Sequence, residues 1–144
     1  MDVLGKSTMS VRTLHTIPRP KGVGGFLEDI RAYRDAFLAR HGMTGLYPVW
    51  KRNTTSFIRE FIRYGFQTII VCVDPKRLDP SFAGRVIDEE FLRDLPPNVD
   101  PCGENGEFHT FVFDGPIFRR AVEFSRREIV CRDSFWFCDL VPRS

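Results

Sequence analysis

The chain has 144 residues, of which 42% are hydrophobic and 14 are phenylalanine, enough apolar material for one globular domain or part of a larger one. With 21 Lys and Arg against 19 Asp and Glu, the net charge of +2 does not favour nucleic acid or a membrane surface as a partner. No apolar run approaches the roughly 20 residues of a membrane helix, and no signal-peptide core precedes the rest, so a cytoplasmic location is expected.

Residues 1–25 differ in composition from the rest of the chain. A polar start leads into residues 17–25, Ile-Pro-Arg-Pro-Lys-Gly-Val-Gly-Gly, which are typical of a linker. We therefore expect an atypical N-terminal segment over residues 1–25 and a folded region over residues 26–144.

Helical patterns come next in the folded region. Apolar side chains recur at helical spacing over residues 26–41 and predict a helix that stops at Gly42. Residues 46–50 are a short apolar element whose proline excludes a helix interior. Asn53 or Thr54 is a suitable cap for a second helix running to about Tyr64.

A nearly continuous β-branched run over residues 66–73 predicts a buried strand. A helix followed by a buried strand is the αβ half of an α/β unit, so the sequence indicates the α/β class. Residues 78–88 are expected to be irregular, and residues 88–95 to form a short helix ended by two prolines.

The C-terminal third is expected to be a small β-rich region. Residues 110–113 and 122–124 have strand patterns, and residues 127–132 and 135–141 predict a hairpin that turns at Asp133-Ser134.

Residues 100–116 are the most informative segment, and they read Asp-Pro-Cys-Gly-Glu-Asn-Gly-Glu-Phe-His-Thr-Phe-Val-Phe-Asp-Gly-Pro. Glycines permit main-chain conformations closed to other residues and let a ligand approach the backbone. Carboxylates and a histidine within a few positions can transfer protons or hold a polar substrate. The same string also suits a plain solvated turn around Asn105-Gly106, so the residues alone leave both interpretations open.

None of the cysteines has the C-x-x-C spacing of a zinc site, and reduced thiols are the default without a secretory signal. Cys102, beside the glycines, is the thiol to test for reactivity. Cys102, Glu104 and His109 are suitable zinc ligands by type, but no second spaced pair completes a site, so no metal is expected.

From about Gly25 onward the chain resembles the diphthine–ammonia ligase family, a branch of the ATP pyrophosphatases. The matching strings are residues 26–34, Gly45-Leu-Tyr-Pro-Val-Trp50, Val71-Cys-Val-Asp74 with Leu78-Asp79, Phe82-Ala-Gly-Arg85 and residues 100–116. The resemblance implies a partial adenine nucleotide alpha-hydrolase-like (Rossmann-like) α/β sheet, followed by the β-rich region.

The resemblance also implies a reaction. ATP with Mg²⁺ activates a carboxylate and releases pyrophosphate, and ammonia then displaces AMP to leave an amide. The best-known substrate of the family is diphthine, the modified histidine of translation elongation factor 2. Nucleotide, ammonia and a protein-borne carboxylate are therefore the expected partners, with no nucleic acid and no membrane.

Site residues follow from the same resemblance. The implied groups are catalytic Glu104, Glu107 and His109; substrate-binding Gly103, Asn105, Gly106, Thr110 and Arg85; and nucleotide-binding Asp29 and Arg31. The amides of the two glycines are candidate donors to an oxyanion. A buried structural role for His109 and a solvated helix face for Arg31 stay open as alternatives.

The family's phosphate loop, Ser-Gly-Gly-Lys-Asp-Ser after a strand, is missing. Residues 4–8, Leu-Gly-Lys-Ser-Thr, lack the second glycine and the aspartate, so this chain alone is not expected to bind ATP. A truncated or frameshifted gene, a deliberate fragment, and a remnant completed by another chain all fit.

The expected function is thus an ATP-dependent amide ligase that is truncated and inactive alone. The alternative is a non-enzymatic substrate-binding module or subunit that needs a separate ATP-binding half. A sheet without its first strands exposes an edge and apolar faces, so a homodimer is also expected.

Overall fold

The computed structural model describes residues 26–143, with side chains from residue 28 onward. The linker predicted over residues 1–25 lies outside the described residues. The chain divides into two compact units, one ending at Trp50 and the other beginning at Lys51.

The first unit contains the helix α1, Phe26–Arg40, close to the predicted bounds. Acidic residues in its first turn and Arg40 in its last turn complement the helix dipole. Gly42, at a φ of 66°, ends the helix, and the N–H of Met43 donates back to the carbonyl of Leu38 at 3.0 Å.

Residues 45–50 fold back onto α1 through aromatic contacts with Arg31. The Arg31 guanidinium lies 4.6 Å from the centre of the Tyr47 ring and 4.9 Å from that of Trp50. The Tyr47 hydroxyl donates a hydrogen bond to Asp35 at 2.9 Å. A Cβ at Gly45 would lie 2.6 Å from the Tyr47 ring, so a larger residue there would require the ring to move.

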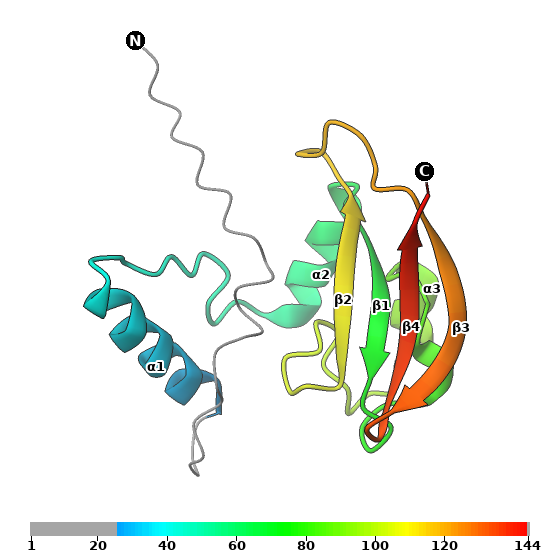
Figure 1. Cartoon of the computed structure of the whole chain (residues 1–144), viewed down its shortest axis with the longest axis horizontal. Helices are drawn as coiled ribbons and strands as arrows, with labels where there is room; N and C mark the ends of the chain where they lie inside the picture. Colours follow the sequence, from blue (N-terminus) through cyan, green and yellow to red (C-terminus); the bar gives the residue numbers. More distant parts are fainter. Residues whose placement is uncertain (1–25, 144) are drawn as a thin grey trace. The chain divides into compact units, whose positions relative to one another are not determined.

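The second unit is a four-stranded sheet with short helices. Its elements are α2 (Thr54–Arg63), β1 (Gln67–Val73), η2 (Pro80–Phe82), α3 (Glu89–Asp94), β2 (Phe108–Asp114), β3 (Phe124–Arg132) and β4 (Phe135–Pro142). The strand order is β2-β1-β4-β3, and every pair of neighbours is antiparallel (Figure 1).

The mixed helix-and-sheet class agrees with the sequence prediction, whereas the described strands form an antiparallel sheet, which does not confirm the Rossmann-like arrangement that the resemblance implied. The run predicted to be a buried strand is confirmed as β1, which is buried along most of its length. The strand predicted at residues 122–124 is not a separate element: only Phe124 belongs to β3, which also contains residues 127–132 and has a register irregularity between Arg126 and Ile129.

One face of the sheet carries the main core, beneath α2 and α3 (Figure 1). Phe91 of α3 is fully buried and lies edge-on to Phe82 and Phe108, with ring centres 5.8 and 6.0 Å away. Ile70 and Val73 supply the β1 side of this core and are also fully buried.

The opposite face holds a second, smaller aromatic cluster. Phe124, at the start of β3, lies edge-on to Phe111 and Phe113 of β2, with ring centres 6.2 and 5.1 Å away. Ile69 pairs with Phe111 in the sheet and is only 1% exposed. Burial on both faces therefore follows from this cluster together with the helices.

β1 pairs with β4 over only a short stretch, and residues 84–87 pair with another part of β1. The N–H of Ile70 donates to the carbonyl of Arg85, and the N–H of Ile87 donates to Thr68, both at 2.9 Å. The segment expected to be irregular thus contains η2 and a strand-like stretch beside β1.

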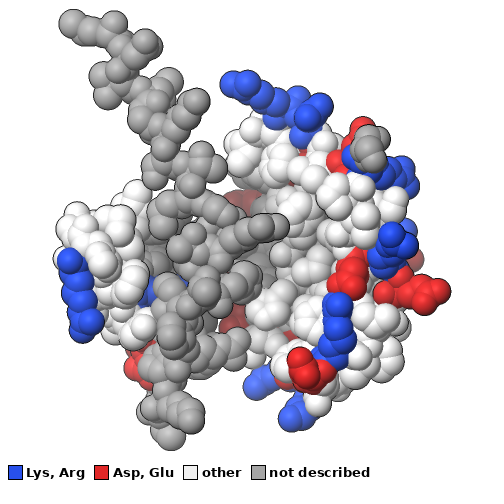
Figure 2. All heavy atoms as spheres, in the orientation of Figure 1, with Lys and Arg blue, Asp and Glu red and all other residues white. Residues whose placement is uncertain are grey.

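Charged side chains of both signs are interspersed on the visible face of the sheet unit (Figure 2). This agrees with the small net charge of +2. Within residues 26–143, no helix has the length and apolarity needed to cross a bilayer.

The β3–β4 turn allows a stability test. Asp133 and Ser134 have φ values of 49° and 68°, a left-handed conformation that favours glycine. We expect Ser134→Gly to raise the free energy of unfolding by about 0.5–1 kcal/mol, because the Cβ strain is removed. Urea denaturation measures the change. Ser134→Ala is the matched control, and an equal gain from alanine would contradict the turn argument.

Candidate functional site

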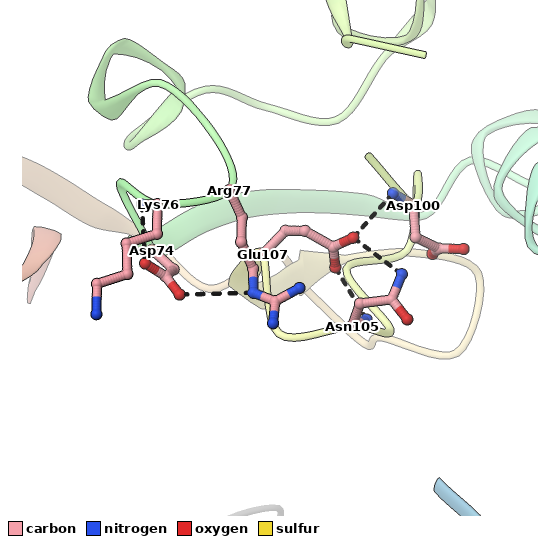
Figure 3. Close-up of polar contacts among 6 residues, drawn as sticks. All are labelled: Asp74, Lys76, Arg77, Asp100, Asn105 and Glu107. Carbon is pink, nitrogen blue, oxygen red and sulfur yellow. Dashed lines mark hydrogen bonds and ion pairs between the residues drawn. The ribbon is translucent and has the colours of Figure 1, made fainter. Parts of the chain in front are cut away.

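The loop before β2 is attached to the end of β1. The main-chain N–H of Asp74 donates to the carbonyl of Glu107 at 2.9 Å, and the Asp74 carboxylate faces Arg77 at 3.7 Å (Figure 3). Residues 100–107 thus project from a fixed edge of the sheet, and we call them the acidic loop.

Glu107 lies inside the acidic loop and is 3% exposed. Its Oε1 accepts hydrogen bonds from the N–H of Asp100 at 3.1 Å and from the Asn105 amide at 3.0 Å (Figure 3). Its Oε2 accepts the N–H of Asn105 at 2.9 Å. Burial alone would raise the pKa of Glu107, but these donors together hold that pKa below its ordinary value.

Asp100 holds the other side of the loop. Its Oδ1 accepts the N–H of Cys102 at 2.8 Å and that of Glu104 at 3.4 Å. Its Oδ2 accepts the hydroxyl of Thr54, in the first turn of α2, at 2.8 Å. The two buried or half-buried carboxylates therefore accept hydrogen bonds from the loop itself, and Asp100 accepts one from α2 as well.

Sequence reasoning did not identify Asp100 and Thr54 as site residues, although one signal was present. The chain contains the dipeptide Asp-Pro at residues 74–75, 79–80 and 100–101. In each, the Asp side chain accepts the N–H two residues on, at 3.0, 2.9 and 2.8 Å. Asp-Pro in this chain thus indicates an Asx-turn, in which the Asp side chain accepts a main-chain N–H two residues on.

The two glycines have positive φ, 69° at Gly103 and 82° at Gly106. Their amides donate inside the loop, from Gly103 to the Asp100 carbonyl at 2.9 Å and from Gly106 to the Gly103 carbonyl at 3.0 Å. In this conformation neither amide points outward as an oxyanion donor.

Glu104 differs from the other two carboxylates because its side chain is exposed. Within the described residues, its carboxylate accepts no hydrogen bond. Partial burial, together with the nearby Asp100 and Glu107 carboxylates, raises its pKa above the ordinary value. Of the three, Glu104 is the carboxylate best placed to exchange a proton with a ligand.

Cys102 is not a reactive thiolate. Burial, with the Asp100 and Glu104 charges, raises its pKa to about 12, so the thiol stays protonated at neutral pH. Its Sγ donates to the Thr54 carbonyl at 3.5 Å.

His109 and Thr110 follow the loop on β2, where both are exposed. In the sheet they stand opposite Cys72 and Ile70 of β1. His109 is thus a surface residue of an edge strand rather than a buried core histidine.

The structure does not link Arg85 to the acidic loop. Its guanidinium pairs with Asp94 of α3 at 2.8 Å and lies 5.0 Å from the centre of the Phe82 ring. These contacts fix Arg85 beside the helices.

Asp29 and Arg31 belong to the first unit. Asp29 is exposed in the first turn of α1, and Arg31 is held by Tyr47 and Trp50 as described above.

A shallow open groove adjoins the anchors of the loop. It is lined by residues of α2 and α3, of the segment between α3 and the acidic loop, and of the loop itself: Thr55, Arg59, Leu92, Leu95, Pro96, Pro97, Val99 and Pro101. Among residues 26–143, no three His, Cys, Asp or Glu side chains are grouped so as to hold a metal ion.

The two loop glycines make a matched pair. A Cβ at Gly103 would meet the Phe108 carbonyl oxygen at 2.9 Å, whereas a Cβ at Gly106 meets nothing within 4 Å. Gly106→Ala should cost about 1 kcal/mol for its positive φ, and Gly103→Ala at least about 1 kcal/mol more. Chemical denaturation of both variants measures this, and equal costs would mean that the loop does not hold this conformation.

Glu107 predicts a pH dependence of stability. A lowered pKa in the folded state stabilises the protein above the unfolded pKa, and this contribution is lost as the pH falls through the folded pKa. Glu107→Gln should therefore lower the free energy of unfolding by roughly 1.5–3 kcal/mol at pH 7. Urea unfolding from pH 7 downward should show the gap from wild type closing below the ordinary glutamate pKa. A gap that is constant with pH would contradict the assignment.

Comparison with known proteins covers the same region. Residues 53–141 match the family described as the diphthamide synthase C-terminal domain. The diphthine–ammonia ligase of Homo sapiens is 32% identical over 114 residues, which is 75% of this chain and 43% of that protein. The ligase of Danio rerio is 30% identical over 114 residues, 75% of this chain and 45% of that protein.

A more distant relative is the diphthine–ammonia ligase of Schizosaccharomyces pombe, 27% identical over 105 residues, or 70% of this chain and 17% of that protein. The chain therefore spans less than half the length of these relatives. The matched residues 53–141 include the whole acidic loop and all of the sheet but its last residue. The chain therefore belongs to the diphthine–ammonia ligase family, and the match is to the C-terminal domain of that family.

Proposed function

We propose that this chain provides the acyl-substrate side of an ATP-dependent amide ligase, in which a carboxylate is adenylated and ammonia then displaces AMP. The observation that carries the proposal is the acidic loop, which lies within the family match: Asp100 and Glu107 accept hydrogen bonds from its main chain, whereas the Glu104 carboxylate accepts none among the described residues. A cytoplasmic, protein-borne carboxylate such as diphthine is the proposed substrate, because the relatives carry that name.

The three proposed catalytic residues, Glu104, Glu107 and His109, have different roles. Glu104 accepts a proton from ammonium, since its carboxylate is exposed and its raised pKa makes it a better base than an ordinary glutamate. Glu107 shapes the loop through its three hydrogen bonds. His109 and Thr110, exposed on the adjoining strand, contact the acyl group or its leaving AMP.

ATP and Mg²⁺ are assigned to another half of the ligase. The printed sequence contains no Ser-Gly-Gly-Lys-Asp-Ser loop, and the described residues offer no comparable phosphate cradle. That half can lie upstream on the same polypeptide or on a separate one. Asp29 and Arg31, in the first unit, are the residues proposed to face it.

A chimera tests the proposal. The N-terminal part of the Homo sapiens relative, joined ahead of residue 26, should amidate diphthine-bearing elongation factor 2, whereas this chain alone should not. Glu104→Gln in the chimera should lower amide formation about 100-fold and leave ATP–pyrophosphate exchange intact, because only the ammonia step needs the base. Mass spectrometry of the factor and radiolabelled pyrophosphate exchange give the two readouts.

Glu128→Gln, an exposed glutamate on β3, is the matched control and should change neither readout. Full amide formation by the Glu104→Gln chimera would remove the proposed role of Glu104. A folded chimera that binds the factor but never exchanges pyrophosphate would favour the substrate-binding module instead.

A further inference from the structure

The acidic loop is fastened to a helix at one place. The Thr54 hydroxyl donates to Asp100 at 2.8 Å, and the Cys102 thiol donates to the Thr54 carbonyl at 3.5 Å. Both groups of Thr54, side chain and main chain, thus contact the first turn of the loop. The two segments are 46 residues apart in sequence at the Thr54–Asp100 bond.

The Thr54 hydroxyl is not needed to cap its own helix. Asn53 is the N-cap of α2, and its side chain accepts the N–H of Ser56 at 2.8 Å. The hydroxyl of Thr54 instead points to Asp100, and the positive end of this ten-residue helix favours the Asp100 charge.

From Asp100 the connection continues to Glu104. The Oδ1 of Asp100 accepts the N–H of Glu104 at 3.4 Å and that of Cys102 at 2.8 Å. The N–H of Asp100 donates to Glu107 at 3.1 Å. Asp100 is therefore bonded to α2, to the main chain of Glu104 and to the buried carboxylate.

We propose that Thr54 and Asp100 are positioning residues, which use the first turn of α2 to hold Glu104 in place for its substrate. They act through the loop and do not touch the reacting atoms. The functional part of this inference rests on the role proposed for Glu104 above, whereas the structural part can be measured without any activity.

Three single variants of the whole chain test the structural part. Thr54→Val removes the hydroxyl and keeps the shape, Thr54→Ser keeps the hydroxyl, and Thr55→Val makes the same change one residue on. Hydrogen exchange at the Cys102 and Glu104 amides should rise roughly 5- to 10-fold in Thr54→Val only. The carboxyl pKa of Glu104, followed by NMR titration, should fall toward its ordinary value in the same variant.

The inference would be overturned if Thr54→Val and Thr55→Val gave the same amide hydrogen exchange and the same Glu104 pKa. It would also be overturned if Thr54→Ser did not keep the wild-type values of both. If Thr54→Val does not fold, Thr54→Ala replaces it, and Thr55→Ala becomes the matched control.

The chimera separates this inference from the proposed function. If Thr54→Val lowers amide formation but not pyrophosphate exchange, and Thr54→Ser restores it, the positioning role is supported. A second outcome is that hydrogen exchange at the loop amides rises in Thr54→Val while Glu104→Gln leaves amide formation unchanged. In that case Thr54 positions the loop, but the role proposed for Glu104 is wrong.

Discussion

The buried carboxylate of Glu107 is the constraint on which the acidic loop depends. A carboxylate that is 3% exposed must be compensated by donors, and here the donors are the main chain and side chain of the loop itself. Its three hydrogen bonds bring Asp100 and Asn105 together and require the tight path through Gly103 and Gly106. The loop is therefore ordered by an internal charge.

The helices and most strands could be predicted from local patterns, because caps and apolar periodicity act over a few residues. Asn53 does cap α2, and the hairpin does turn at Asp133-Ser134. Strand direction could not be read in this way. The run in β1 shows burial on both faces, but nothing in it tells whether a second helix layer or the Phe124 cluster covers the far side. The Rossmann-like expectation came from the resemblance to a nucleotide-binding family and not from the strand pattern itself.

The sequence indicated a candidate loop but could not separate the roles of its carboxylates. Glycines alternating with carboxylates singled out residues 100–107, where the residues alone left a ligand site and a plain turn both open, and both glycines do have positive φ. Sequence treats Glu104 and Glu107 alike, because each follows a glycine. Only the fold shows that one is turned inward against three donors and the other outward. The tether from Thr54 to Asp100 was beyond local reasoning, since 46 residues separate its ends.

The opposite pKa shifts of Glu104 and Glu107 arise from one arrangement. Donors gathered on Glu107 favour its charge and lower its pKa, despite burial. Glu104 lacks such donors, and burial plus the Asp100 and Glu107 charges raise its pKa. The loop thus concentrates negative charge behind one accessible carboxylate. Such a group attracts a cation such as ammonium and takes up its proton more readily than an isolated glutamate would. Phosphate binding needs the reverse, amides and cations that gather negative charge, which is the physical reason why the proposed function assigns ATP to another part of the ligase.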